Sequence, residues 1–164
     1  MKSLIITIAI VLTCHSSVMA YEEITGKVIS VVDGTTLEVV SNDNQVYKIR
    51  LVGIDSPELT QEYGGEAKEF LEKLILEKSV LVKITGKDRL GRYLAEIVIE
   101  GKTDPRVELL KRGLTWTAEK SPLPDLEEYR VKAQQKGKGL WKQREPTPPW
   151  IYRRQQSMLQ AKSI

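Results

Sequence analysis

The sequence predicts a mainly β protein with helices, an α+β fold built on a five-stranded Greek-key barrel of the OB type with about three helices. The first observation is that alternating or β-branched apolar residues, typical of half-buried strands, recur in five segments. The second is a helical apolar stripe between the third and fourth of these segments. The third is that two more helical segments follow the fifth strand. Three strands, a helix, two strands and then helices is the element order expected of this barrel.

Turn signals and alternation define the expected strands. The Asp33-Gly34 pair is a turn signal between the first two strands. Alternation in the third strand puts Ile49 and Leu51 on one face, so we expect Arg50 to point to the other. The five strands are expected at residues 24–32, 36–40, 46–52, 80–84 and 93–99.

The helices are expected on three further patterns. Residues 66–77 carry one apolar stripe, with charged residues outside it. A second, short helix begins after Asp104, an N-cap residue followed by proline, and ends at Gly113. A third is expected at residues 122–136. Residues 145–150 contain three prolines and are expected to be extended.

Residues 1–20 have the features of a signal peptide. Lys2 provides a short positive start, and residues 4–12 form an apolar run that is too short to span a bilayer comfortably. Ala20 is a small residue at a cleavage point. We therefore expect export, to a periplasm or out of the cell. Two alternatives remain open: an uncleaved membrane anchor, and a lipoprotein attached through Cys14.

Cleavage after residue 20 limits the chemistry of the mature chain. It removes Cys14 and His15, the only cysteine and the only histidine. Disulfides, zinc sites, cysteine nucleophiles and Ser-His-Asp triads are then excluded. The remaining residues divide into one domain, 21–145, and a basic, proline-containing C-terminal tail, 146–164. The tail either steers the protein toward an anionic polymer or is simply solvated.

Charged residues gather at the ends of the predicted strands. Arg50 and Arg92 could hold a phosphodiester through paired hydrogen bonds. Glu58 could take a proton from water, and Asp55 could hold a hard cation through oxygen. Three of these residues also have an ordinary interpretation: Arg50 as a strand surface residue or part of a structural ion pair, Glu58 as a loop carboxylate, and Arg92 as a hairpin arginine paired with Asp88. Together they form the parts of a metal-assisted phosphodiesterase.

These residues lie in motifs that resemble those of the staphylococcal nuclease (thermonuclease) family of calcium-dependent nucleases. The resemblance runs from about residue 24 to residue 141, and its six elements occur in the family's order. The elements are Val31-Val32-Asp33-Gly34, Arg50-Leu51 with Gly53-Ile54-Asp55-Ser56-Pro57-Glu58, Gly65 to Ala67, Asp88-Arg89 with Gly91-Arg92 and Leu94-Ala95, Arg112-Gly113-Leu114, and Gly139-Leu140-Trp141. Pro148-Pro149-Trp150 with Arg153-Arg154 also looks like the tail of many bacterial members.

The resemblance implies roles for individual residues. Arg50 and Arg92 match the two catalytic arginines, and Glu58 matches the catalytic glutamate. Asp55 matches a Ca²⁺ ligand, and Ser56 holds the position whose backbone carbonyl is another. The family cleaves DNA and RNA at the 5′ O–P bond and leaves 3′-phosphate ends.

The first turn departs from the family pattern. The family usually reads Asp-Gly-Asp-Thr there, and its second aspartate is a calcium ligand. This chain reads Asp33-Gly34-Thr35-Thr36, so that carboxylate is missing. Calcium affinity depends on the charge of the ligands. Thr35 is either a weak ligand or a lost one, and Asp33 is a turn residue, a supporting group or a substitute ligand.

The leading hypothesis is an exported, calcium-dependent, monomeric endonuclease acting on single-stranded or frayed DNA and RNA, without stable membrane association once the signal is removed. The alternative is a non-catalytic OB-fold module that binds nucleic acid, its calcium site eroded at Thr35. A third is an envelope interaction protein that keeps only the scaffold. Joint presence of Arg50, Glu58 and Arg92 favours the enzyme, because a binder has no evident need for a carboxylate near a phosphate.

Overall fold

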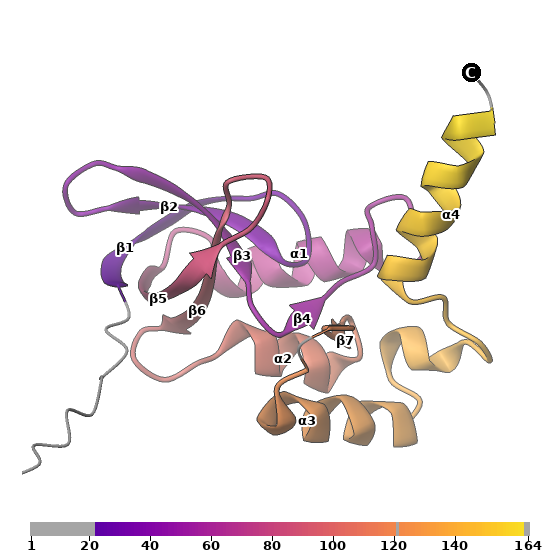
Figure 1. Cartoon of the computed structure of the whole chain (residues 1–164). Coiled ribbons are helices and arrows are strands. Elements are labelled where there is room, and N and C mark those ends of the chain that lie inside the picture. The colour runs from indigo at the N-terminus through magenta and orange to yellow at the C-terminus, as the bar shows by residue number, and fades with distance from the viewer. Residues whose placement is uncertain (1–21, 121, 163–164) are drawn as a thin grey trace, which may run out of the picture.

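The computed structural model describes residues 22–120 and 122–162, and the expected signal peptide lies outside them (Figure 1). A closed five-stranded barrel with strand order β1-β2-β3-β6-β5 forms the body of the protein, which confirms the predicted fold class. Its strands are β1 (Glu22–Val31), β2 (Thr36–Ser41), β3 (Val46–Leu51), β5 (Ser79–Lys87) and β6 (Tyr93–Ile99).

The predicted helices are present, and the C-terminal segment adds another. They are α1 (Gly64–Ile75), α2 (Pro105–Arg112), α3 (Pro124–Gln135), a 3₁₀ turn at Gly139–Lys142, and α4 (Pro149–Lys162). Asp104 caps α2 as expected, since its Oδ1 accepts from the Arg106 backbone N–H at 2.9 Å. Much of the segment expected to be a tail is therefore helical, and Figure 1 shows α4 standing beside the domain.

One apolar core joins the barrel to its helices. Strand side chains such as Val28, Ile49 and Ile97 are completely buried, and so are residues on the inner faces of α1 and α2. The stripe expected on the first helix is buried in the structure at Ala67, Leu71 and Ile75. Burial of apolar side chains of this size contributes about 1.5–3 kcal/mol each, so the core fixes the barrel and its strand ends.

The register of β3 places chemical groups next to one another. Arg50 pairs with Thr36 of antiparallel β2 and with Leu94 of parallel β6. Residues two apart on a strand share a face, so Arg92, just before β6, falls on the same side as Leu94. Both predicted arginines therefore lie at one end of the barrel.

A small second sheet was not predicted from the sequence. β4 (Ile54–Asp55) pairs with β7 (Trp116–Thr117), with Asp55 opposite Trp116. The turn before β2 packs tightly against this region, because a Cβ on Gly34 would lie 2.5 Å from Ser56 Oγ. Only glycine permits that approach. The close packing brings the β1–β2 turn beside Asp55.

Aromatic residues attach α4 to the domain. The ring centroids of Trp150 and Trp116 lie 5.7 Å apart, and those of Trp116 and Trp141 lie 4.4 Å apart. The Tyr152 hydroxyl lies 2.9 Å from Thr60 Oγ1. The three tryptophans therefore pack against one another.

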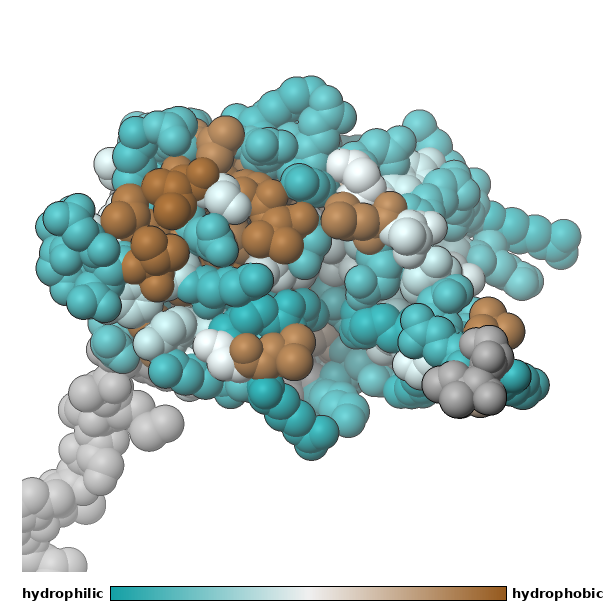
Figure 2. All heavy atoms as spheres, turned by 90° about the horizontal axis from the view of Figure 1, so that it is seen from above, coloured by the Kyte–Doolittle hydropathy of each residue, from teal (hydrophilic) through white to brown (hydrophobic). Residues whose placement is uncertain are grey.

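The surface seen from above in Figure 2 is largely hydrophilic, with apolar residues gathered mainly over one part of that face. Within residues 22–120 and 122–162, no helix is both long and apolar enough to cross a bilayer.

Candidate active site

A pocket of about 780 Å³ opens where the β1–β2 turn, the end of β3, the segment after β4 and the β5–β6 loop meet. All the residues that the sequence analysis singled out line this pocket. They are Arg50, Glu58, Arg92, Asp55, Ser56, Asp33 and Thr35. The structure thus brings into one place groups that are up to 59 positions apart along the chain.

The two arginines are held in similar ways. Arg50 donates from NH2 to Asp55 Oδ1 at 2.7 Å and from NH1 to Thr35 Oγ1 at 3.4 Å. Arg92 donates from Nε to Asp88 Oδ2 at 2.6 Å, the hairpin pair that the ordinary interpretation expected. Each side chain remains about one-fifth exposed, at 21% and 20%. Their guanidinium groups are thus positioned by the protein and still open to an anion.

Asp88 is ionised more readily than a free aspartate. Burial opposes its charge, but hydrogen bonds from the side chain and backbone of Arg92 outweigh this effect and lower the pKa of Asp88. A charged Asp88 keeps the Arg92 fork oriented at neutral pH.

Asp33 closes the β1–β2 turn. Its Oδ1 accepts hydrogen bonds from the Thr35 N–H at 2.7 Å, the Thr36 N–H at 2.8 Å and the Thr35 hydroxyl at 3.0 Å. This is the geometry of an aspartate that caps a turn. Of the three roles left open for Asp33, the contacts are those of a turn residue.

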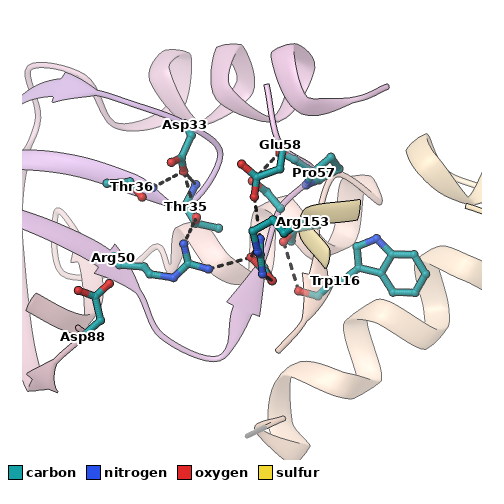
Figure 3. Close-up of polar contacts among 12 residues, drawn as sticks. Asp33, Thr35, Thr36, Arg50, Pro57, Glu58, Asp88, Trp116 and Arg153 are labelled. Atoms are coloured by element: carbon teal, nitrogen blue, oxygen red, sulfur yellow. Dashed lines mark hydrogen bonds and ion pairs between the residues drawn. The ribbon is translucent and has the colours of Figure 1, made fainter. Parts of the chain in front are cut away.

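A residue that the sequence analysis did not place in the site occupies its centre. Arg153 of α4 donates from NH2 to Asp55 Oδ2 at 2.6 Å and from NH1 to Glu58 Oε1 at 2.7 Å. Figure 3 shows Arg153 of α4 near Arg50 of β3. Asp55 accepts hydrogen bonds from both of these arginines. Burial disfavours the charge of Arg153, but the two carboxylates more than compensate and raise its pKa.

Sequence spacing gave no signal for this contact. Arg153 is 98 positions from Asp55 and 95 from Glu58. The sequence places it in a basic tail that looks like that of many bacterial family members, with no role in the site. The available clue was the Pro-Pro-Trp segment just before it, which positions α4 through Trp150.

The residues as arranged do not fit a calcium ion. Ca²⁺ requires six to eight oxygen ligands. Both Asp55 oxygens instead accept hydrogen bonds from guanidinium groups, and the Thr35 hydroxyl donates to Asp33. Among residues 22–120 and 122–162, no group of three or more acidic, His or Cys side chains could hold a metal. The expected ligand set of Asp55, Ser56, Asp33 and Thr35 therefore differs from the observed arrangement, whose cation beside Asp55 is Arg153.

Comparison with known proteins defines the class of the fold and site. The model of the staphylococcal nuclease homologue family matches residues 48–143, a range that contains Arg50, Asp55, Glu58 and Arg92. The chain belongs to the staphylococcal nuclease family.

Individual relatives agree with this assignment. The chain is 34% identical over 147 residues to a protein of Escherichia coli O157:H7 named as an uncharacterized endonuclease, covering 89% of this chain and 95% of the relative. It is 32% identical over 158 residues to a similarly named protein of Haemophilus influenzae, covering 96% and 88%. A probable staphylococcal-like nuclease of Oryza sativa subsp. japonica is 41% identical over 110 residues, covering 66% of this chain and 33% of the relative.

Proposed function

We propose that this protein is an exported endonuclease that hydrolyses phosphodiester bonds of DNA and RNA and leaves 3′-phosphate ends. The observation that carries the proposal is the convergence of Arg50, Arg92 and Glu58 on one open pocket. Membership of the nuclease family and the names of the relatives support a nuclease. The end chemistry and the choice of substrate come from the family resemblance.

The arginines account for binding and for transition-state stabilisation. A phosphodiester is an anion that repels nucleophiles, and its negative charge spreads over the equatorial oxygens as water attacks phosphorus. Arg50 and Arg92 hold forks of N–H donors at the ends of adjacent strands. Donors fixed in position before the reaction stabilise developing charge at little reorganisation cost.

Glu58 is the general base that accepts the proton of the attacking water. Its carboxylate accepts the proton as the water oxygen bonds to phosphorus. The bond from phosphorus to the 5′ oxygen breaks, and that oxygen takes a proton from solvent. Oε1 of Glu58 is held by Arg153, and the side chain is 40% exposed, so water can reach the carboxylate.

The decisive experiment is digestion of heat-denatured DNA and of RNA by residues 21–164, with added calcium, with magnesium and with chelator. We expect fragments of both substrates with 3′-phosphate and 5′-hydroxyl ends. Denatured DNA should be cut faster than duplex, since single strands enter an open pocket more easily. Binding without cleavage under every metal condition would instead support the alternative, a non-catalytic nucleic-acid-binding module.

A further inference from the structure

We propose that Arg153 is the resident cation of this active site. Its guanidinium lies between Asp55 and Glu58 and neutralises both carboxylates, so that hydrolysis proceeds without a bound metal. This inference rests on the proposed function and specifies what neutralises and orders its two carboxylates. Arg153 acts through Glu58 and Asp55, and is therefore a positioning residue.

The contacts of Arg153 form one continuous network. One guanidinium nitrogen binds Asp55 Oδ2 at 2.6 Å, and the other binds Glu58 Oε1 at 2.7 Å and Asp55 Oδ1 at 3.3 Å. Asp55 Oδ1 also accepts from Arg50 at 2.7 Å. Arg153 thus orients Glu58 directly and Arg50 through Asp55. Such bridging of two carboxylates suits the planar fork of arginine.

Burial favours a second cation beside Asp55. The Asp55 side chain is only 9% exposed and Arg50 donates to its Oδ1 alone, so loss of Arg153 would leave the buried Oδ2 without this hydrogen bond, which is costly. The family usually has a second aspartate at the position of Thr35, but Thr35 is neutral and only 2% exposed, so it adds no ligand charge. A dication beside a single buried carboxylate would lack the oxygen ligands it requires. A monovalent guanidinium matches that carboxylate and the adjoining Glu58.

The side chains that line the pocket carry a net positive charge, which favours an anionic substrate. Four carboxylates and five cationic side chains line it, and the balance becomes positive only because Arg153 is included. The carboxylates are Asp33, Asp55, Glu58 and Asp88, and the cations are Arg50, Arg89, Arg92, Lys120 and Arg153. A phosphodiester therefore enters a site that is already cationic without a metal.

The attachment of α4 argues that Arg153 stays in place during turnover. Pro149 is buried, and the Trp150 ring packs on Trp116. The Tyr152 hydroxyl contacts Thr60 at 2.9 Å, and Arg154 binds Glu119 at 2.6 Å. The residues on both sides of Arg153 are thus fixed to different parts of the domain. A helix that opened and closed as a lid would have fewer contacts with the domain than α4 has.

The test replaces Arg153 and follows metal dependence. Arg153→Gln removes the charge, Arg153→Lys keeps it without the fork, and Lys162→Gln, which removes an exposed cation far from the pocket on the same helix, is the matched control. Steady-state cleavage of heat-denatured DNA is measured with chelator and with millimolar calcium, and kcat is separated from KM. Calorimetry measures calcium binding to each protein directly, and thermal melts show that each one is folded.

We expect the wild type and Lys162→Gln to keep their rates within about twofold in chelator and to bind no calcium at millimolar concentration. Arg153→Gln should lose about a hundredfold in kcat in chelator, with a smaller change in KM. Arg153→Lys should retain an intermediate kcat.

Two results would overturn the inference and leave the proposed function standing. One is a wild type that cleaves only with calcium. The other is an Arg153→Gln variant as active in chelator as the wild type. A folded wild type that cleaves under no condition would instead refute the proposed function itself.

Discussion

At the scale of single residues, the charged side chains of the pocket have separate roles. Arg50 and Arg92 are each fixed by a carboxylate at 2.7 Å and 2.6 Å, respectively, and they still reach solvent. Glu58 is the carboxylate that remains 40% exposed. The carboxylates that position the arginines are therefore different from Glu58, the carboxylate that water can reach. The motifs that resemble the family revealed Arg50, Glu58 and Arg92, but they could not reveal the contacts of Arg153.

Replacement of the reacting groups tests these roles. Arg50→Ala, Arg92→Ala and Glu58→Gln should each lower kcat at least about a hundredfold, since a positioned transition-state contact contributes about 3 kcal/mol. Cleavage of denatured DNA measures the loss. Lys73→Gln, which breaks only an exposed pair with Glu69 on α1, serves as the control and should leave the rate unchanged. Near-normal rates in all three variants would show that the site lies elsewhere.

Asp33 provides a second test at the residue scale. Because its Oδ1 accepts three hydrogen bonds from Thr35 and Thr36, Asp33→Ala should lower the free energy of unfolding by about 1–2 kcal/mol. Asp33→Asn keeps an acceptor oxygen and should cost less. Urea unfolding measures both. If Asp33→Ala unfolds like the wild type and only the response to calcium changes, then the role of Asp33 is metal binding and not closure of the turn.

At the scale of elements, the best predictions were for segments with a clear period or clear end signals. The strand β6 has the predicted bounds, and α2 lies between its predicted cap and stop signals. The strands β4 and β7 have two residues each, too few for a hydrophobic period to be visible, and they form through pairing with each other. The helix α4 buries only Pro149 strongly, so no apolar stripe marked it, and its position depends on tryptophan contacts across the chain.

The link between α3 and β7 carries a pH-dependent contribution to stability. Glu127 accepts from the Thr117 hydroxyl at 2.7 Å and from Arg130 Nε at 2.8 Å. The hydrogen bond from Arg130 is the main cause that lowers the pKa of Glu127 below its ordinary value of 4.5, against the opposing effect of burial. A lowered folded-state pKa stabilises the fold above the unfolded pKa, and the contribution is lost as the pH falls through the folded one.

Glu127→Gln should therefore lower the free energy of unfolding at pH 7, by about 1 kcal/mol or less because the side chain is 38% exposed. The difference from the wild type should shrink as the pH falls below about 4.5. Denaturant unfolding at several pH values measures it. The control is Glu128→Gln, which removes an exposed pair with Lys132 and should change stability by a few tenths of a kcal/mol at most. Equal effects of the two variants at pH 7 would contradict the argument.

At the scale of the whole molecule, most of the fold followed from the order of elements and most of the site from the resemblance. The barrel closes as predicted, and all seven candidate residues reach one pocket. What could not be predicted is the contribution of the C-terminal segment to the site. A long-range ion pair leaves no periodic trace in the sequence. Its formation requires that α4 dock on the finished domain, and docking depends on the shapes of surfaces that only the folded chain possesses.

Export is the remaining property of the whole molecule. When the full chain is expressed in a bacterial host with two membranes, we expect it in the periplasm or the medium, with Tyr21 as its first residue. Intact-mass measurement of the purified protein determines this. Ala20→Leu should block processing, because the cleavage site requires a small residue, whereas Ala20→Gly should be processed like the wild type.

The two alternatives, a membrane anchor and a lipoprotein, predict different protein masses and different cell fractions. A chain that keeps residues 1–20 and sediments with membranes would be anchored through its apolar run, and a lipid mass added at Cys14 would show a lipoprotein. Either result would hold the domain at a membrane surface. The pocket would then meet only nucleic acid that reaches that surface, and the rate of cleavage would be limited by delivery of the substrate. Release after cleavage at Ala20 instead lets the enzyme diffuse to its substrate.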